Sequence, residues 1–253
     1  MPHPVRKAVL MAAGRGTRLG DLTAHTPKPM LTVAGAPILA HILAGLAHAG
    51  VEQTIVVTGY LAEQIEEFCA RRAGVGGRMK IATVRQRELN GTAGAMLAAM
   101  PLLAGEQRFL FGWGDILMDR ASYARFMEQA RSAEYDLMLA VNRTGDPYRG
   151  AAVYLDAGMR VERIVEKPPR GTSTTNWNSA GLFASTPRLF EYVRRLVPSP
   201  RGELELPEAV AAMIRDGLLV LAVDIRGFWS DVGEPDDLER ARKQFKPLRP
   251  MSD

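Results

Sequence analysis

The sequence predicts a single α/β domain in which helices flank a Rossmann-like, mixed and mostly parallel sheet. Strand-like and helix-like segments alternate over about residues 5–142, and short strands and loops dominate over about residues 143–245. Strands separated by helices are typical of right-handed βαβ units around a parallel sheet. We therefore expect one domain over residues 1–253, with two halves, a smaller β subregion in the second half and a flexible tail over residues 246–253.

In the first half, each expected element has its own local signal. The run KAVLMA at 7–12 predicts a buried strand, and TIVVT at 54–58 predicts a β-branched one. The segment 37–48 begins with proline and repeats apolar residues at helical spacing, and LAEQIEEFCARR at 61–72 is amphipathic, so both predict helices. The other expected elements are strands at 79–84, 108–111 and 137–141 and a helix at 92–103.

The second half carries shorter strand signals. They are the segments AAVYLD, RVERIVEKP, NSAGLFAS and LLVLAVD, which begin at residues 151, 160, 178 and 218. Helices are expected near 187–196, near 206–216 and from 235 to about 245. The turn FWSDVGEP comes directly before the last helix.

The composition excludes several classes of partner. The net charge is +4 and the basic residues are scattered rather than interleaved with aromatic ones, so we expect no nucleic-acid partner. No apolar run reaches the ~18–20 residues that span a bilayer, and the N-terminus has no signal-peptide pattern, so we expect no membrane partner. The single cysteine, Cys69, suits a reducing cytoplasm, which is the expected location. The oligomeric state is left open.

The stretch VLMAAGRGTRLGDLTAHTPKPML, residues 9–31, carries the strongest chemical pattern. An apolar run enters a loop with Gly14 and Gly16, and glycine lets backbone N–H groups approach phosphate oxygens closely. The loop is neither a Walker A motif nor a GxGxxG fingerprint, because Leu19 replaces the third glycine. Arg18 and Lys28 add two cations, which we expect on a solvent-facing loop. The pattern predicts a polyphosphate site.

These residues also resemble a known family. The motifs AAGRGTRL, TPKPML and AGAPIL are similar to the signature of the sugar-1-phosphate nucleotidylyltransferases, or nucleotide-sugar pyrophosphorylases. Seven further motifs follow in the family's order, so that the resemblance runs from Lys7 to about Arg242: QRELNGTAGAM, FGWGDI, DPYRGAAV, EKP, NSAGLF, GELEL and FWSDVGEPDDL.

The resemblance implies an enzyme that condenses a nucleoside triphosphate with a sugar 1-phosphate, giving an NDP-sugar and pyrophosphate. The first half would bind the nucleotide and the second half the sugar. Arg18 and Lys28 would be catalytic. The expected nucleotide-binding residues are Ala13, Gly14, Gly16, Thr17, Gln86, Gly91 and Thr92. The expected sugar-phosphate-binding residues are Gly150, Glu166, Lys167, Asn178, Gly181 and Glu205.

Two aspartates are the expected ligands of Mg²⁺. Asp115 follows the strand-like RFLF, so a parallel sheet would place it at a carboxyl end, where ligands bind. Asp231 lies in the turn FWSDVGEP. Mg²⁺ favours carboxylates together with substrate phosphates. By resemblance, this pair would hold the metal. Gly112 and Trp113 depart from the family's small polar residue before GD.

Gln86 resembles the base-reading glutamine of uracil- and thymine-using members, so UTP or dTTP is favoured. Its amide can both donate to and accept from a pyrimidine imide edge. Asn90 and Asp21 depart from the family pattern near the base and the phosphate loop. Alternatives are a cytidylyl- or guanylyltransferase of the same fold, a cytidylyltransferase for a non-sugar phosphate such as phosphocholine, and a non-catalytic nucleotide-sugar sensor.

Overall fold

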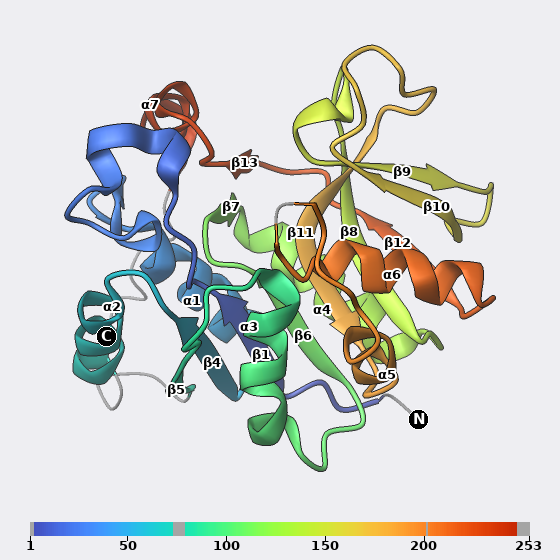
Figure 1. Cartoon of the computed structure of the whole chain (residues 1–253), viewed down its shortest axis with the longest axis horizontal. Helices are drawn as coiled ribbons and strands as arrows, with labels where there is room; N and C mark the ends of the chain where they lie inside the picture. Colours follow the sequence, from blue (N-terminus) through green and yellow to red (C-terminus); the bar gives the residue numbers. More distant parts are fainter. Residues whose placement is uncertain (1–2, 73–78, 201, 247–253) are drawn as a thin grey trace.

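The computed structural model describes residues 3–72, 79–200 and 202–246, and it shows an α/β fold built on a nine-stranded sheet (Figure 1). Seven strands follow the order β10-β9-β11-β6-β1-β4-β5, and β8 and β12 extend from β11. Helices lie on both faces of this sheet. The mixed α/β architecture expected from the sequence is confirmed.

The first half of the chain contributes the parallel part of the sheet. It consists of β1 (Lys7–Met11), β4 (Gln53–Thr58), β5 (Lys80–Arg85) and β6 (Phe109–Trp113), which pair in parallel. The inner strands are almost continuously apolar and buried, as expected for strands covered on both faces. All four strands therefore end at the same edge of the sheet.

The second half pairs differently. It contributes β8 (Leu137–Arg143), β9 (Ala151–Leu155), β10 (Val161–Glu166), β11 (Trp177–Ser185) and β12 (Val220–Asp224). Strand β11 is antiparallel to β6, β8 and β9, and β9 is antiparallel to β10, while β12 is parallel to β8. The sheet is therefore parallel in the first half and mainly antiparallel around β11.

Alternation along β1 divides the core into two clusters. Ala8 and Leu10 face one cluster, and Val9 faces the other. The first cluster lies under α1 (Ile38–His48), α2 (Ala62–Arg72), α4 (Arg120–Ser132) and α7 (Pro235–Gln244). The second lies under α3 (Thr92–Ala99), α5 (Leu189–Val193) and α6 (Leu206–Arg215). Both faces of the sheet are thus buried, which holds the strand ends in fixed positions.

Short elements shape the edge where the strands end. They are the 3₁₀ segments η1 (Thr17–Thr23), η2 (Lys28–Met30), η3 (Met100–Leu103) and η4 (Pro147–Arg149), and the short strands β2 (Thr32–Val33), β3 (Ala36–Pro37), β7 (Ile116–Met118) and β13 (Trp229–Asp231). The segment η3 also ends α3 earlier than expected, because Pro101 cannot continue an α-helix.

We did not predict helix α4 from the sequence, although its signal is present. Tyr123, Phe126, Met127 and Ala130 are buried at helical spacing, and the side chain of Asp119 caps the helix by accepting a hydrogen bond from the backbone N–H of Ser122 at 2.8 Å. Periodicity together with the N-cap residue would have identified this helix.

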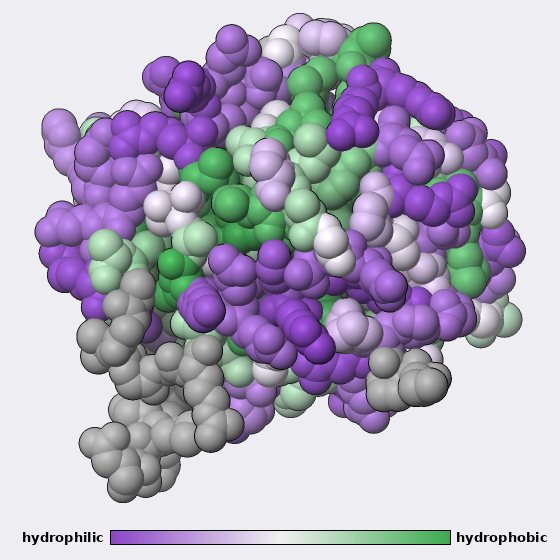
Figure 2. Space-filling model, turned by 90° about the horizontal axis from the view of Figure 1, so that it is seen from below, coloured by the Kyte–Doolittle hydropathy of each residue, from purple (hydrophilic) through white to green (hydrophobic). Residues whose placement is uncertain are grey.

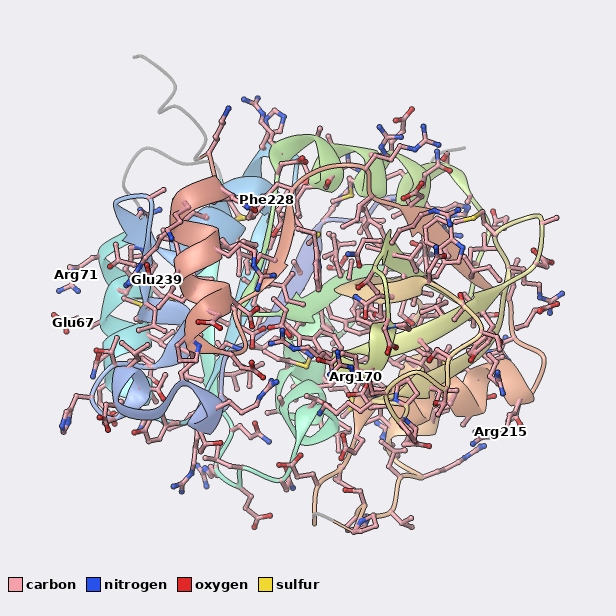
Figure 3. All side chains as sticks on the ribbon, turned by 90° about the horizontal axis from the view of Figure 1, so that it is seen from above. Glu67, Arg71, Arg170, Arg215, Phe228 and Glu239 are labelled. Atoms are coloured by element: carbon pink, nitrogen blue, oxygen red, sulfur yellow. The ribbon has the colours of Figure 1, made fainter. Side chains whose placement is uncertain are left out.

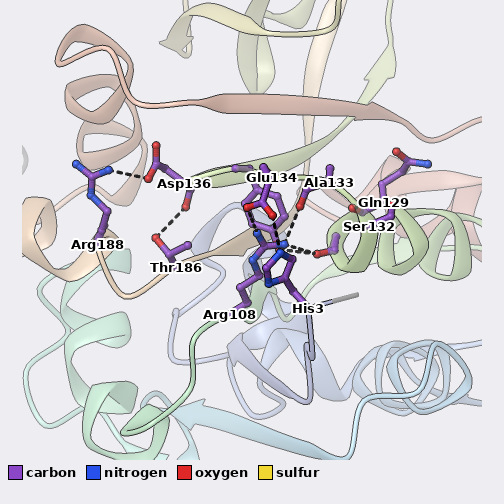
Figure 4. A network of polar contacts seen from close by, with 11 residues as sticks. His3, Arg108, Gln129, Ser132, Ala133, Glu134, Asp136, Thr186 and Arg188 are labelled. Atoms are coloured by element: carbon purple, nitrogen blue, oxygen red, sulfur yellow. Dashed lines mark hydrogen bonds and ion pairs between the residues drawn. The ribbon is translucent and has the colours of Figure 1, made fainter. Parts of the chain in front are cut away.

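The C-terminal end of α4 is held by a buried guanidinium (Figure 4). Arg108 donates to the carbonyl oxygens of Ala130 and Ala133 at 3.2 and 2.7 Å and pairs with Glu134 at 2.9 Å. Helix ends leave carbonyl groups without intrahelical partners, and this cation satisfies two of them. Arg108 thereby joins β6 to α4 on the side of the sheet away from the strand ends.

Figure 2 shows the molecule from below, where hydrophilic residues cover much of the face and hydrophobic ones show between them. No helix in the described ranges is both long and apolar enough to cross a membrane.

Cys69 is buried in the first core cluster. The expected flexible tail begins at Lys246, and residues 247–253 lie outside the described ranges.

The packing of α1 against α4 leads to a stability prediction for Gly45→Ala. Alanine is favoured over glycine inside a helix by about 1 kcal/mol, but a Cβ at Gly45 would overlap the buried Tyr123 ring. Overpacking costs about 1–3 kcal/mol, so we expect a net loss in the free energy of unfolding measured with urea. In a Tyr123→Leu background the same substitution should cost less. A stabilising effect of Gly45→Ala would contradict this account of the contact.

Candidate functional site

A cavity of about 530 Å³ opens at the edge where the parallel strands end. Seen from above, α7, where Glu239 is labelled, lies to the left of the labelled Arg170 (Figure 3). Eight of the predicted site residues line this cavity: Arg18, Asp115, Gly150, Glu166, Lys167, Asn178, Gly181 and Asp231. The cavity thus brings together residues from both halves of the chain.

Asp115 and Asp231 are brought together by a two-stranded ladder. Strand β7 begins directly after Asp115, and its first residue, Ile116, is paired with Asp231, the last residue of β13. The backbone N–H of Val232 also donates to the carbonyl oxygen of Asp115 at 3.3 Å. Antiparallel pairing therefore fixes two carboxylates that are far apart in the sequence next to each other.

Lys28 lies against this carboxylate pair. Its ammonium donates to Asp115 Oδ2 at 2.6 Å and lies 3.6 Å from Asp231 Oδ1. The expectation that Lys28 faces solvent is wrong, because only 7% of the residue is exposed. Pro27 and Pro29 restrict the backbone on either side of it and direct the side chain inward.

Burial and charge act in opposite directions on this cluster. Burial lowers the pKa of Lys28, but the Asp115 and Asp231 carboxylates outweigh it and leave the pKa above its ordinary value. Burial raises the pKa of Asp231, and the charge of Asp115 raises it further, against the opposing effect of Lys28. Lys28 is therefore charged at neutral pH.

The carboxylate pair fits a hard divalent cation. Asp115 Oδ1 is buried and has no hydrogen-bond partner in the described chain. An orphaned carboxylate oxygen is costly unless a cation or donor completes it. No group of three His, Cys, Asp or Glu side chains arranged for a metal occurs among the described residues. A metal here would take its other ligands from water or substrate, which suits Mg²⁺.

The glycine-rich loop after β1 adopts the backbone that its glycines allow. Gly16 and Gly20 have positive φ angles of 67° and 56°, and Thr23 Oγ1 donates to the carbonyl oxygen of each, at 3.1 and 3.2 Å. A Cβ at Gly14 would meet nothing within 4 Å, so the loop is open at this point. Of the predicted loop residues, Ala13 is buried and Thr17 is exposed, and neither they nor Gly14 and Gly16 line the cavity.

Arg18 is exposed, lines the cavity and makes no ion pair with the described part of the chain. A Cβ at Gly233, two residues after Asp231, would lie 3.3 Å from its guanidinium. Its positive charge acts on both Lys28 and Asp231. The guanidinium is thus placed beside the carboxylate pair with its hydrogen-bond donors available to an anion.

Gln86 lies at the end of β5, with its backbone N–H bound to the carbonyl oxygen of Thr58 at the end of β4. Its side-chain nitrogen donates to Asn90 Oδ1 and to the carbonyl oxygen of Gly91, both at 3.0 Å. Both N–H groups of the amide, one of which we expected to face a base, are therefore used within the chain. Its oxygen has no hydrogen-bond partner in the described ranges and remains an acceptor.

The loop that contains Gly91 and Thr92 is docked onto the start of α6. Leu204 exchanges two backbone hydrogen bonds with this loop, accepting from Ala93 at 2.9 Å and donating to Asn90 at 2.7 Å. The hydroxyl of Thr92 accepts from the backbone N–H of Leu206 at 2.9 Å. Gly91 has φ 102°, and a Cβ there would overlap Leu204. This loop therefore positions α6, which forms one wall of the cavity.

In the second half, the predicted residues Glu166, Lys167, Gly150 and Asn178 form one contiguous group. The side-chain Nζ of Lys167 lies 3.5 Å from Oε1 of Glu166. The backbone N–H of Lys167 donates to the carbonyl oxygen of Gly150 at 2.7 Å. A Cβ at Gly150 would overlap the end of the Asn178 side chain, so any larger residue there would have to displace this amide.

The two remaining residues predicted to bind the sugar phosphate are Gly181, which lines the cavity, and Glu205, which does not. Gly181 lies next to Ile116, and a Cβ at this position would overlap that side chain. Glu205 does not line the cavity, and its carboxylate accepts from Ser199 Oγ at 3.1 Å. Glu205 therefore lies behind the wall that α6 presents to the cavity.

Sequence reasoning missed Trp113 and Arg149 as site residues. Trp113 lines the cavity and stacks on Phe183, with the ring centroids 5.0 Å apart. Arg149 crosses from η4 to the first turn of α7, where it pairs with Asp237 at 2.7 Å and Glu234 at 3.3 Å. Trp113 stands directly before Gly114 and Asp115, where the family has a small polar residue, so this departure was a signal in the sequence. Arg149 lies in the motif DPYRGAAV, but nothing in the sequence indicated its pairing, because its partners are far away in the chain.

The profile of the family described as "Nucleotidyl transferase" matches residues 7–246. The chain is 32% identical over 252 residues to the UTP–glucose-1-phosphate uridylyltransferase AglF of Haloferax volcanii, which covers 95% of this chain and 96% of that protein. It is 31% identical over 238 residues to the bifunctional protein GlmU of Methanococcus maripaludis, covering 94% of this chain and 54% of that protein. The chain thus spans about half the length of the GlmU relatives that it matches.

A solved structure of UDP-glucose pyrophosphorylase complexed with UDP-glucose superimposes with a TM-score of 0.83 at 20% identity. The match covers 95% of this chain and 98% of that one. This likeness shows that the two chains share a fold.

The bridge from Arg149 to α7 predicts a loss of stability in Arg149→Met. Asp237 is buried and would keep Arg240 as its only charged partner among the described residues. A hydrogen bond to a charged group contributes about 1.5–3 kcal/mol. We therefore expect the free energy of unfolding, measured with urea, to fall by an amount near the lower end of this range. Arg226→Met is the matched control, because its pair with Asp224 is exposed and should contribute at most about 1 kcal/mol. Equal losses in the two variants would show that the bridge adds nothing beyond a surface pair.

Proposed function

The chain belongs to the nucleotidyl transferase family, and from this premise we propose that it condenses a nucleoside triphosphate with a sugar 1-phosphate, releasing pyrophosphate and forming a nucleotide-sugar. The observation that carries the proposal is the cluster of Lys28, Asp115 and Asp231 at the carboxyl edge of the sheet. Ligands of open α/β sheets bind at this edge. The name of the Haloferax volcanii relative, which is similar over nearly its whole length, supports a uridylyltransferase of this kind.

The reaction needs positioned charge rather than a nucleophilic side chain. A phosphate oxygen of the sugar 1-phosphate attacks the α-phosphorus of the triphosphate, a new P–O bond forms, and the bond to the β-phosphate oxygen breaks. The electron pair of that bond leaves with pyrophosphate. The sugar phosphate is already anionic, so no base has to remove a proton. Catalysis then depends on orientation and on stabilising the negative charge that develops.

The cations of the site have separate roles in this proposal. Arg18, beside the turn that carries Asp231, stabilises the leaving pyrophosphate. Lys28 lies under the phosphate loop and steadies the α-phosphate. Lys167, next to Glu166 at the sugar end of the cavity, holds the sugar phosphate, while Glu166 accepts hydrogen bonds from sugar hydroxyls.

Asp115 and Asp231 are the residues that would hold Mg²⁺. The orphaned Oδ1 of Asp115 supports this assignment. When bound, a magnesium ion supplies charge neutralisation between the phosphates of the two substrates. Gly14, Gly16 and Thr17 of the phosphate loop and Gly150, Asn178 and Gly181 at the sugar end keep their proposed binding roles, whereas Glu205, which does not line the cavity, would support α6.

We propose UTP or dTTP as the nucleotide. With its nitrogen bound to Asn90 and Gly91, the amide of Gln86 presents only its oxygen to a ligand. Uracil and thymine carry an N3–H that this oxygen can accept, whereas N3 of cytosine is itself an acceptor. The fixed amide therefore disfavours pairing with cytosine at N3.

The proposal is tested by measuring pyrophosphate release. Purified protein is incubated with Mg²⁺, each of UTP, dTTP, CTP, GTP and ATP, and a panel of sugar 1-phosphates, with phosphocholine as the non-sugar acceptor. We expect release with UTP or dTTP and at least one sugar 1-phosphate. If pyrophosphate were released only with phosphocholine, the acceptor would be a non-sugar phosphate rather than a sugar 1-phosphate. Nucleotide-sugar binding without release in any mixture would indicate a sensor.

For the metal ligands, we expect Asp115→Asn and Asp231→Asn each to reduce Mg²⁺-dependent turnover by at least ~10²-fold, because a neutral amide is a poorer ligand for a hard cation. The assay is the Mg²⁺ dependence of pyrophosphate release. The matched control is Asp224→Asn, which removes an aspartate that pairs with exposed Arg226. Normal turnover by Asp231→Asn at limiting Mg²⁺ would place the second ligand elsewhere.

For the base, we expect Asn90→Leu to lower the ratio of kcat/KM for UTP over CTP by about 2- to 10-fold. The variant removes one of the two acceptors that orient Gln86, and a hydrogen bond contributes about 0.5–1.5 kcal/mol. Asn90→Asp keeps an acceptor at this position and should keep the ratio. An unchanged ratio in Asn90→Leu would mean that Gly91 alone fixes the amide or that Gln86 does not read the base.

A further inference from the structure

We infer that the Lys28 ammonium keeps the metal site closed in the free protein, so that a divalent cation binds Asp115 and Asp231 only when Lys28 leaves them. The inference rests on the proposed function for the identity of the metal and of the nucleotide. Its physical content is a competition between two cations for one pair of carboxylates, and it can be tested without turnover.

The distances place Lys28 where a metal would have to bind. Its Nζ lies 2.6 Å from Asp115 Oδ2 and 3.6 Å from Asp231 Oδ1. Magnesium needs carboxylate oxygens at about 2.0–2.1 Å, so an ion that used these two oxygen atoms would overlap the ammonium or lie in direct contact with it. The repulsion between the two cations would be strong in so buried a position.

The surrounding charge adds to this effect. Arg18 acts on the same cluster with a positive charge of its own. A divalent ion entering the free site would therefore meet two carboxylates and two cations. This balance attracts a metal weakly, even though Asp115 Oδ1 has no partner among the described residues.

Lys28 can leave only through its side chain, because its backbone is fixed. Met30 and Leu31 donate backbone hydrogen bonds to Pro27 and Lys28 at 2.8 and 3.1 Å. Four methylene groups separate this backbone from the ammonium. The stem passes the phosphate loop at Gly16, where a Cβ would lie 3.2 Å from Lys28 Cβ. A phosphate bound at this loop is therefore a second partner within the reach of Nζ.

The consequence is that nucleotide and metal open the site for each other. A triphosphate gives Lys28 an alternative anion, which releases the carboxylates to the metal. A metal on the carboxylates in turn repels Lys28 toward the phosphates. Coupling between two binding events is reciprocal and typically amounts to about 5- to 150-fold in affinity.

The test measures Mn²⁺ binding to the protein without nucleotide, from the electron paramagnetic resonance signal of free Mn²⁺. We expect Lys28→Met and Lys28→Gln to bind Mn²⁺ at least ~10-fold more tightly than the wild type, although both should have lost turnover. Lys28→Gln retains a hydrogen-bond donor for Asp115, so it separates loss of charge from loss of packing. Circular dichroism checks that each variant is folded.

Two further variants locate the effect. Lys167→Met removes a lysine that lines the cavity and pairs with Glu166, and this variant should bind Mn²⁺ like the wild type. Adding Asp115→Asn to Lys28→Met should abolish the gain. The inference is overturned if neither Lys28 variant binds more tightly, or if Lys167→Met gains as much. Failure of the wild type to release pyrophosphate would overturn the proposed function and leave this binding result unaffected.

Discussion

The site depends on one interaction, the contact of a buried ammonium with two carboxylates. Burying Lys28 alone would be costly, as would holding Asp115 and Asp231 side by side without a cation. Each group makes the position of the others tolerable. The fold therefore has to bring three distant segments to one point, and it does so with general devices: a strand that ends at Trp113, a two-residue return to β7, and an antiparallel pair between β7 and β13.

The walls of the cavity are fixed to this point by contacts that cross between the halves of the chain. Arg149 joins η4 to the first turn of α7, directly after the turn that carries Asp231. On the other side, Leu204 and Thr92 join the loop after Gln86 to the start of α6. The loop that follows Gln86 therefore also holds one wall of the cavity. These contacts thus tie both walls of the cavity to the turn that carries the carboxylates.

Sequence reasoning located what depends on local pattern and missed what depends on distant partners. The strands of the first half have continuous apolar runs, and Asp115 follows such a run, so its place at the sheet edge could be predicted. The burial of Lys28 against both aspartates could not, because Asp115 and Asp231 are far from Lys28 in the sequence and are brought together by the β7–β13 ladder. The same holds for Arg149 and for the use of the Gln86 nitrogen by Gly91. Helix α4 is different, because its periodicity and cap were present in the sequence.

The charges of the cavity suggest why such a site would respond to its substrates together rather than to anions in general. Lys28, Lys167 and Arg149 each already have a carboxylate partner, in Asp115, Glu166 and Asp237. A single small anion would have to displace a carboxylate from its cation. The free energy of binding would then be only the difference between the new ion pair and the one that was broken. A triphosphate and a divalent cation that arrive together can complete an exchange, in which phosphate oxygens take the ammonium while the cation takes the carboxylates. Lys28, the buried cation of the three, then keeps an anionic partner throughout, so its burial does not oppose binding. If the chain acts on the proposed substrates, the internal ion pairing of the free site would select for the complete set of ligands.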